Sequence, residues 1–345
     1  MRIFAVLFFL SCISISCSDQ IKPQLFTSVA VEDVFEDSVS IRAIEFLDAN
    51  TLAFAGSGGI YGTVDVPSGK VRTNIMEYDS ITPSFRAVGH TATDFFMLSI
   101  TNPALLYKTG GNGKMELVYS EEGESVFYDA LKFWNDQEGI AVGDTVDGCL
   151  SIIITRDGGE TWQKIPCDKL PKGVEGEGAF AASNTNIAIQ GDQAWIGTTS
   201  GSIYHSMDKG KTWESIATPM KNDVNTQGIY SIDFYDENMG IAIGGDYTKP
   251  EVNQGNKMKT KNGGATWSLI ADGEDPGYKS CIQFVPNSEA MGVIAIGFTG
   301  ISYSSDGGDH WEQLSDEGFY TFRFLNDSTA YAAGKNRISK LTFKN

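Results

Sequence analysis

Nine charged or phenolic side chains could bind a ligand: seven stand near the starts of short hydrophobic segments, and Asp144 and Asp246 end the segments that follow two of these starts. They are Arg42, Arg86, Asp129, Asp144, Glu177, Tyr230, Asp246, Lys279 and Tyr320. Guanidinium groups bind carboxylates in two-pronged pairs, and functional side chains are commonly placed where strands meet loops. An internal ion pair, such as Arg86 with Asp129, would give the same pattern without a ligand. These residues form a candidate ligand-binding rim, provided that the fold brings them together.

The sharpest enzymatic alternative for this rim is a glycan hydrolase of the sialidase type. Such a site needs three arginines for the substrate carboxylate, a tyrosine nucleophile with a glutamate partner, and an acid. Arg42 and Arg86 are available, but Arg156 lies in a repeated turn motif and gives no clear third arginine. The segment around Arg42 reads "IRAIEF" and lacks the Arg-Ile-Pro that sialidases usually carry. No catalytic residue is therefore assigned.

An oxidoreductase is the other enzymatic alternative. A dinucleotide site needs a glycine-rich turn between a strand and a helix, and no such unit occurs. The stretch "GSGG" at 56–59 lies between predicted strands and is typical of a hairpin turn. A quinone cofactor at the same rim remains an alternative, although no residue calls for one. We predict no cofactor.

Metal ligands are sparse and scattered. The three histidines, His90, His205 and His310, are far apart in the chain. Asp144 and Asp147 could offer oxygen ligands to Ca²⁺, but loop capping is the favoured role of these acids. We predict no metal site.

Cys149 and Cys167 are predicted to form a disulfide. They flank a hairpin centred on Gly158 at equal distances, so they would face each other across antiparallel strands. An exported compartment permits the bond. Cys281 falls in a predicted inner strand, where it would act as a small buried hydrophobic residue.

The composition favours a large all-β protein and excludes one class of function. The 345 residues include 38 glycines, 10 prolines and 41% hydrophobic residues, which suits many short strands joined by turns. The net charge is −18, the opposite of what binding to nucleic acid requires.

The first residues resemble an export signal. Arg2 precedes an apolar run at 3–10 that is too short to span a bilayer. The stretch "SISC" at 14–17 resembles a bacterial lipoprotein signal, and "FLSC" at 9–12 is a second candidate, so Cys17 or Cys12 would carry the lipid. We predict a signal peptide at 1–16, a tether at 17–24 and a lipid anchor as the sole membrane contact. Ser18 favours the outer membrane, facing the periplasm or the cell surface.

A turn motif recurs four times. The stretches "TRDGGETW", "SMDKGKTW", "TKNGGATW" and "SSDGGDHW" begin at residues 155, 206, 260 and 304, and their tryptophans follow one another at 51, 54 and 44 residues. A period near 50 indicates stacked supersecondary units. The acids and amides, Asp157, Asp208, Asn262 and Asp306, can accept backbone N–H groups within the turn, and glycines supply the unusual backbone angles. The tryptophans, Trp162, Trp213, Trp267 and Trp311, would lie on the returning strand and pack between sheets. Because the acids recur in every unit, we expect a structural role for them.

Each unit begins with a similar alternating strand. Seven such starts occur, at residues 41–46, 85–88, 128–133, 179–183, 229–234, 278–284 and 319–324. They predict a seven-bladed β-propeller over residues 25–345, with the candidate rim around one mouth of its central channel. The segment 25–35 would add the missing outer strand and close the ring, which removes open sheet edges.

The turn motif is identified as the Asp-box, or BNR, repeat of β-propellers. Nearly the whole chain resembles the bacterial Asp-box propellers related to the photosystem II stability and assembly factor, on stretches such as "FYDALKFWNDQEGIAVGDTVDG" and "GIAIGGDYTKP". Members of this kind are often labelled oxidoreductases or glycosyl hydrolases. The resemblance implies a binding scaffold, since the best-understood relative is an assembly chaperone. We therefore expect a monomeric assembly or scaffolding factor of the cell envelope that binds a protein or small ligand at the mouth, with an enzyme at the same mouth as the alternative.

Overall fold

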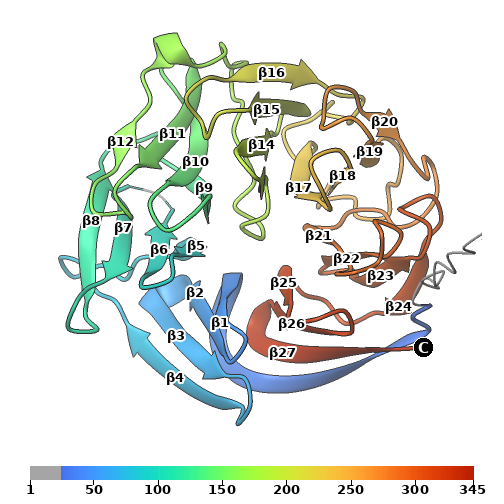
Figure 1. Cartoon of the computed structure of the whole chain (residues 1–345), viewed down its shortest axis with the longest axis horizontal. Coiled ribbons are helices and arrows are strands. Elements are labelled where there is room, and N and C mark those ends of the chain that lie inside the picture. Colours follow the sequence, from blue (N-terminus) through green and yellow to red (C-terminus); the bar gives the residue numbers. More distant parts are fainter. Residues whose placement is uncertain (1–24, 101) are drawn as a thin grey trace, which may run out of the picture.

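The computed structural model describes residues 25–100 and 102–345 (Figure 1). The predicted signal peptide, the tether and both candidate lipidation sites, Cys12 and Cys17, lie outside the described residues. The described chain is all β, apart from two single-turn 3₁₀ segments, η1 (Ser57–Gly59) and η2 (Cys167–Lys169). Within this described part, no helix is long and apolar enough to cross a membrane.

Five antiparallel sheets of four strands each stand around a common axis, with one strand of each sheet at the centre (Figure 1). In chain order, the first sheet has β5 (Phe85–His90), β6 (Phe95–Ser99), β7 (Ala104–Thr109) and β8 (Met115–Glu121), and the second has β9 (Tyr128–Phe133), β10 (Gly139–Val146), β11 (Cys149–Thr155) and β12 (Gln163–Lys164). The third has β13 (Ile187–Gln190), β14 (Gln193–Gly197), β15 (Ser202–Ser206) and β16 (Glu214–Ala217), and the fourth has β17 (Ile229–Phe234), β18 (Gly240–Gly244), β19 (Lys257–Thr260) and β20 (Ser268–Leu269). The fifth has β21 (Cys281–Phe284), β22 (Val293–Gly297), β23 (Gly300–Ser304) and β24 (Glu312–Ser315).

A seven-stranded sheet joins the first and last parts of the chain. Its strands, in spatial order, are β25 (Thr321–Phe324), β26 (Thr329–Ala333), β27 (Lys335–Lys344), β1 (Ser28–Asp48), β2 (Thr51–Gly56), β3 (Ile60–Asp65) and β4 (Lys70–Ile75). The long strand β1 pairs with β27 from Ser28 to Ser40 and with β2 from Ile41 to Asp48. The N-terminal strand thus covers the edge of β27, as expected from the segment 25–35.

The hydrophobic core lies between neighbouring sheets. One cluster joins Phe96 and Leu98 of β6 to Leu131 of β9 and Ala141 of β10, with Trp162 at its outer side. Trp162 packs edge-on against Phe96 and Phe133, with ring centroids 6.3 and 5.8 Å apart. Each tryptophan of the repeated turn lies one residue before an outer strand, and does not lie on the strand itself.

The four repeated turns share one hydrogen-bond pattern. The carboxylate or amide oxygen accepts the backbone N–H four residues later, at Thr161, Thr212, Thr266 and His310, over 2.8–3.0 Å. The hydroxyl two residues earlier, on Thr155, Ser206, Thr260 and Ser304, donates to the same oxygen and accepts the N–H of the glycine four residues after it. Burial raises the pKa of Asp208, but the hydrogen bonds from Thr212 outweigh it and lower that pKa overall. These side chains fasten turns.

Cys149 and Cys167 form a disulfide, with Cα atoms 5.6 Å apart. Cys149 begins β11, whereas Cys167 lies in η2, beyond the end of β12. The register pairs Ile153 with Lys164, so the hairpin is centred half a residue beyond Gly158 and Cys167 is not directly opposite Cys149 on a strand. Cys281 is a buried free thiol.

Candidate functional site

Residues 179–186, which we call the channel plug, fill the centre of the ring (Figure 1). The prediction of an inner strand at 179–183 is wrong, because the inner strand of this sheet is β13, which begins at Ile187. The plug forms hydrogen bonds to other sheets and does not pair as a strand within its own sheet. Asn184 donates to the Val88 carbonyl (2.7 Å) and accepts the Leu131 N–H (2.9 Å).

Further hydrogen bonds from the plug reach the remaining inner strands. Ser183 donates to the carbonyl of Ser280 (2.6 Å), and its own carbonyl accepts from Thr321 (2.8 Å). Thr185 donates to Ser231 (2.7 Å) on β17. Because the plug occupies the axis, it separates the channel into two ends, and the predicted mouth becomes a closed face.

Arg42 and Arg86 lie side by side at this face. Each donates a long hydrogen bond of 3.5 Å to a plug carbonyl, Arg42 to Ala182 and Arg86 to Ala181. Neither guanidinium lies within 4.0 Å of a carboxylate of the described residues, and the buried Nε of Arg42 has no partner there. Burial, together with the charge of Arg42, lowers the pKa of Arg86. The two cations are thus held close together without an ion pair.

Two buried carboxyl groups lie beneath the plug. Asp129 is fully buried, and neither of its oxygens makes a well-aligned hydrogen bond within the described chain. Burial, and then the neighbouring Asp144, raise the pKa of Asp129 well above its ordinary value. Burial also raises the pKa of Asp144 to about 6, although its Oδ1 accepts the Ala179 N–H at 3.2 Å. The raised pKa of Asp129 goes together with the absence of an ion pair between Asp129 and Arg86.

An aromatic strip continues from the arginines across the face. It consists of Phe180, Tyr230, Tyr278, Tyr247 and Phe298. Phe180 stacks on Tyr230 with centroids 3.6 Å apart, and Tyr278 packs edge-on against Tyr230 at 4.8 Å. Tyr247 and Phe298 end the strip and are 48% and 44% exposed. Apart from Tyr230, the sequence analysis missed these residues, although Tyr278 directly precedes the chosen Lys279.

A pocket of about 440 Å³ opens beside the arginines, between Arg86, Asp144 and the first residues of the plug. Glu177 lines it, but its carboxylate is fully used. It accepts from Thr198 (2.8 Å), Tyr204 (3.0 Å), Ser200 and the backbone of Val174. Glu177 therefore braces the loop before the plug and is not a free ligand.

Two predicted rim residues do not join the arginines. Lys279 is buried and donates to the Thr299 hydroxyl (3.2 Å) and the Gly300 carbonyl (3.0 Å). Burial lowers its pKa to about 8. Because side chains alternate along an extended segment, Tyr278 faces the mouth and Lys279 faces the gap between sheets. Asp246 caps its own turn by accepting the backbone N–H and hydroxyl of Thr248.

The structure leaves the sialidase-type arrangement incomplete. Arg156 lies on the outer turn after β11, where it pairs with Glu138 at 3.1 Å. Tyr320 does approach Arg42, with the guanidinium carbon 3.9 Å from the ring centroid. Over the described residues, no three His, Cys, Asp or Glu side chains gather as a metal site would require.

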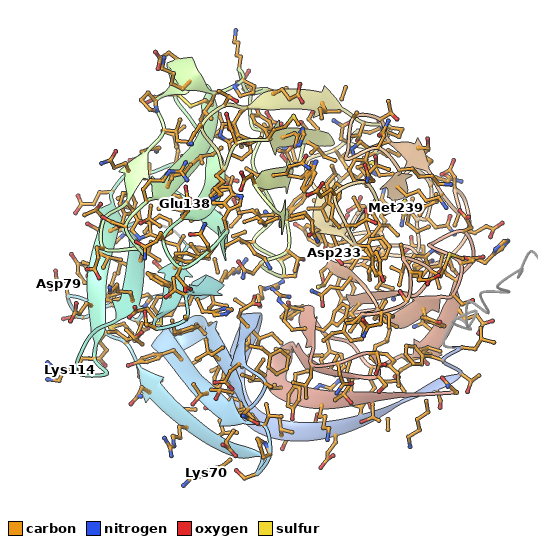
Figure 2. The ribbon with its side chains drawn as sticks, viewed as in Figure 1. Lys70, Asp79, Lys114, Glu138, Asp233 and Met239 are labelled. Atoms are coloured by element: carbon orange, nitrogen blue, oxygen red, sulfur yellow. A yellow bond between two sulfur atoms is a disulfide. The ribbon has the colours of Figure 1, made fainter. Side chains whose placement is uncertain are left out.

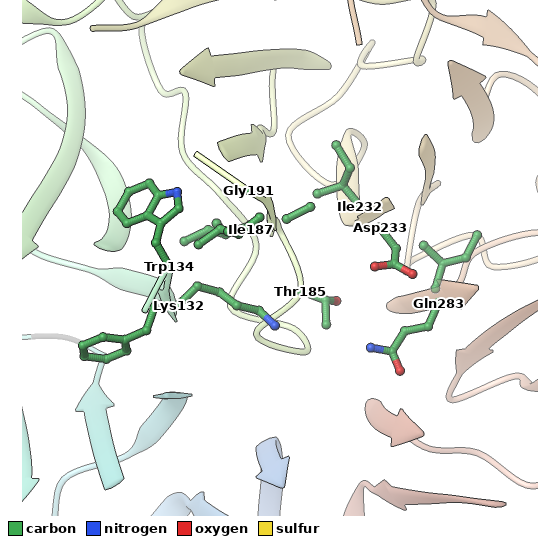
Figure 3. A pocket seen from close by; sticks show the side chains of 12 residues that line it. Lys132, Trp134, Thr185, Ile187, Gly191, Ile232, Asp233 and Gln283 are labelled. Atoms are coloured by element: carbon green, nitrogen blue, oxygen red, sulfur yellow. The ribbon is translucent and has the colours of Figure 1, made fainter. Parts of the chain in front are cut away.

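A second polar pocket lies at the other end of the channel and was also missed (Figure 3). Lys132, Asp233 and Gln283 project into it from β9, β17 and β21. Each lies near the end of an inner strand, and the sequence analysis considered only residues near the start of that strand. The alternation of side chains along these strands was enough to predict this pocket.

Solved structures share the fold at low sequence identity. One described as YCF48 bound to D1 peptide has a TM-score of 0.66 and 13% identity, covering 93% of this chain and 99% of that chain. YCF48 from Cyanidioschyzon merolae has a TM-score of 0.65 and 14% identity, covering 91% and 99%. The WD40 repeats of RRP9 have a TM-score of 0.63 and 9% identity, covering 92% and 98%.

These neighbours confirm a β-propeller fold like that of YCF48, the photosystem II assembly factor. No curated protein sequence matches this chain. The family model described as Sortilin-Vps10, "Sortilin, neurotensin receptor 3", matches residues 150–336, which is more than half of the chain. The chain therefore belongs to the Sortilin-Vps10 family.

Proposed function

We propose that the plugged face is a protein-binding surface that holds a peptide segment with a carboxylate next to apolar side chains. The observation that carries the proposal is the pair Arg42 and Arg86, two adjacent guanidiniums without a carboxylate partner in the described chain. Like charges held together in a partly buried place repel each other, and a bound carboxylate would relieve that repulsion.

The aromatic strip supports a peptide over a small ion. Tyr247 and Phe298 offer exposed aromatic surface at the end of the strip, and aromatic residues with arginine are typical of protein-binding hot spots. The plug supports a surface partner as well, because it leaves no open channel for a substrate to enter at this end. One structural neighbour is a YCF48 bound to a D1 peptide, which is a property of that protein and an analogy for this one.

The wider role that we propose is that of an exported, monomeric assembly or scaffolding factor of the cell envelope. The apolar run at 3–10 and the "SISC" stretch support export and a lipid on Cys17, with the propeller facing the periplasm or the cell surface. We further propose seven blades. Support comes from β1, whose two halves pair with different strands, so that the seven-stranded sheet divides into two blades.

Site-specific photocrosslinking in native envelopes tests this function. A photoreactive residue at Phe298 should give an adduct with one envelope protein, and the adduct should disappear in an Arg42→Gln/Arg86→Gln background. The control position is Leu117 on the outer strand β8, which is 41% exposed. No adduct from Phe298, or the same adducts from Leu117, would contradict the proposal and favour an enzyme acting at this face.

A further inference from the structure

The pocket at the far end of the channel carries polar groups that the proposed function does not use. Its volume is about 370 Å³, which falls within the range of small-molecule sites. Figure 3 shows the side chains of Lys132, Asp233 and Gln283 pointing toward a common space beside Thr185 of the plug. The plug separates this space from Arg42 and Arg86, so the two ends can be tested independently.

Two of these groups lack the hydrogen bonds that their chemistry requires. The Lys132 ammonium lies 4.0 Å from the nearer oxygen of Glu45 and makes no hydrogen bond to a residue of the described chain. The buried Oε1 of Gln283 likewise has no donor there. The Lys132 side chain is 28% exposed, so only the Gln283 oxygen is buried. Leaving that oxygen without a donor costs free energy, and a ligand that supplies the donor recovers it.

Glu45, the carboxylate next to the Lys132 ammonium, is shared with Arg323. Glu45 accepts from Arg323 at 3.2 Å, and Arg323 also donates to Thr321 and to the Phe322 carbonyl. Although burial raises the pKa of Glu45, Lys132 and Arg323 outweigh it and lower that pKa. Glu45 is therefore ionised and hydrogen-bonded to Arg323, whereas Lys132 pairs with it only at 4.0 Å and keeps its hydrogen-bond donors for a ligand.

Opposite the ammonium, Asp233 offers an acceptor. It accepts the Phe284 N–H at 2.8 Å and also interacts with the Phe234 N–H, which still leaves acceptor capacity on its carboxylate. Burial raises its pKa to about 6, so it is mostly ionised at neutral pH. Between the two poles most of the pocket surface is polar, and the side chains of Ile187, Ile232 and Trp134 supply its apolar part.

We propose that this pocket binds a small zwitterion, an α-amino acid with an apolar side chain. Its carboxylate pairs with the Lys132 ammonium, and its ammonium donates to Asp233 and to the Gln283 Oε1. Its side chain lies against Ile187 and Ile232. Both charges of the ligand are needed, because each pole of the pocket recognises one of them.

Calorimetric titration of the wild-type protein with valine, leucine, isoleucine and methionine tests the proposal. At least one should bind, with an affinity at least tenfold above that of 4-methylpentanoate, which lacks the amine, and of 3-methylbutylamine, which lacks the carboxylate. This comparison needs no variant. Lys132→Met and Asp233→Asn should each weaken binding at least tenfold, while Lys114→Met, at the outer edge of the ring (Figure 2), should not.

Binding in this pocket should not depend on the arginines of the plugged face. Arg42→Gln/Arg86→Gln should leave amino-acid affinity unchanged. The proposal is wrong if none of the four amino acids binds at concentrations up to about 10 mM, tenfold above a millimolar Kd. It is equally wrong if either half-molecule binds as well as the amino acid, or if folded Lys132→Met binds like wild type.

Discussion

The Arg42 guanidinium lies over the Tyr320 ring, with its carbon 3.9 Å from the ring centroid, where the inner part of β1 meets the start of β25. The two residues are 278 positions apart in the chain and meet because β1 completes the ring. The stacking fixes Arg42 next to Arg86 without neutralising either charge. In the proposed function, it therefore keeps two cations in place for a carboxylate at the plugged face.

Replacing Tyr320 by Ala should lower the affinity for carboxylate-bearing peptides by about 2- to 30-fold, the range that a cation–π contact of about 0.5–2 kcal/mol implies. Tyr320→Phe keeps the ring and should bind nearly like wild type. Fluorescence anisotropy with a labelled peptide measures both. Equal losses in the two variants would show that the phenol matters and the stacking does not.

The stability of the protein should fall as the pH rises through the pKa of Asp144. Folding raises this pKa from an ordinary value near 4 to about 6, so the native state binds more protons than the unfolded state between these values. The stabilisation is complete below pH 4 and lost above pH 6. Asp144→Asn mimics the protonated form and should gain about 1–3 kcal/mol relative to wild type between pH 4 and pH 8.

Urea unfolding at several pH values checks this expectation. Part of the wild-type slope should persist in Asp144→Asn, because burial also raises the pKa values of Asp129 and Asp233. A difference between variant and wild type that stays constant from pH 4 to pH 8 would contradict the assignment.

Removing the disulfide with Cys149→Ser/Cys167→Ser should cost about 3 kcal/mol of unfolding free energy, the loop-entropy value for a separation of 18 residues. Denaturant titration gives the number. A chain of residues 25–345, denatured without reductant, should label one thiol, that of Cys281. Labelling of three thiols would mean that the bond does not form.

The repeated turns predict a graded effect at Asp208. Asp208→Ala removes the acceptor for the Thr212 N–H and hydroxyl and for Lys211, and should cost about 1–3 kcal/mol. Asp208→Asn should cost less, because Asn262 fills the same place in another turn. Thermal unfolding ranks the variants. Equal Tm values for wild type and Asp208→Ala would remove the structural role.

Local signals in the sequence were enough to predict the all-β fold. The repeated Asp157-type turns specify hairpins through contacts within a few residues, and the alternating segments specify strands. The pairing of residues 28–40 with the last strand was expected because an outer strand was missing there. The blade count remains a prediction.

Long-range packing explains what the sequence did not predict. The plug sequence "AFAASNTN" looks like a strand start, but Asn184 and Thr185 bond to sheets at 88, 131 and 231, and no local pattern encodes those partners. The choice of Lys279 over Tyr278 failed for a related reason, since a strand start does not reveal which face meets the axis. Asp129 was found, but its raised pKa follows from burial and from the neighbouring Asp144, which no local pattern reveals.

The central claim is that Arg42 and Arg86 recognise a carboxylate on a partner segment. The most direct measurement selects displayed peptides on the wild-type protein and measures the affinity of the selected sequences as carboxylate and amide forms. We predict that the selected peptides carry a carboxylate next to an apolar or aromatic residue. Their affinity should fall at least about tenfold on amidation and with Arg42→Gln/Arg86→Gln. It should not fall with Arg72→Gln, which lies on the exposed outer strand β4. Peptides that bind equally well as amides, or equally well to the double variant, would contradict the claim.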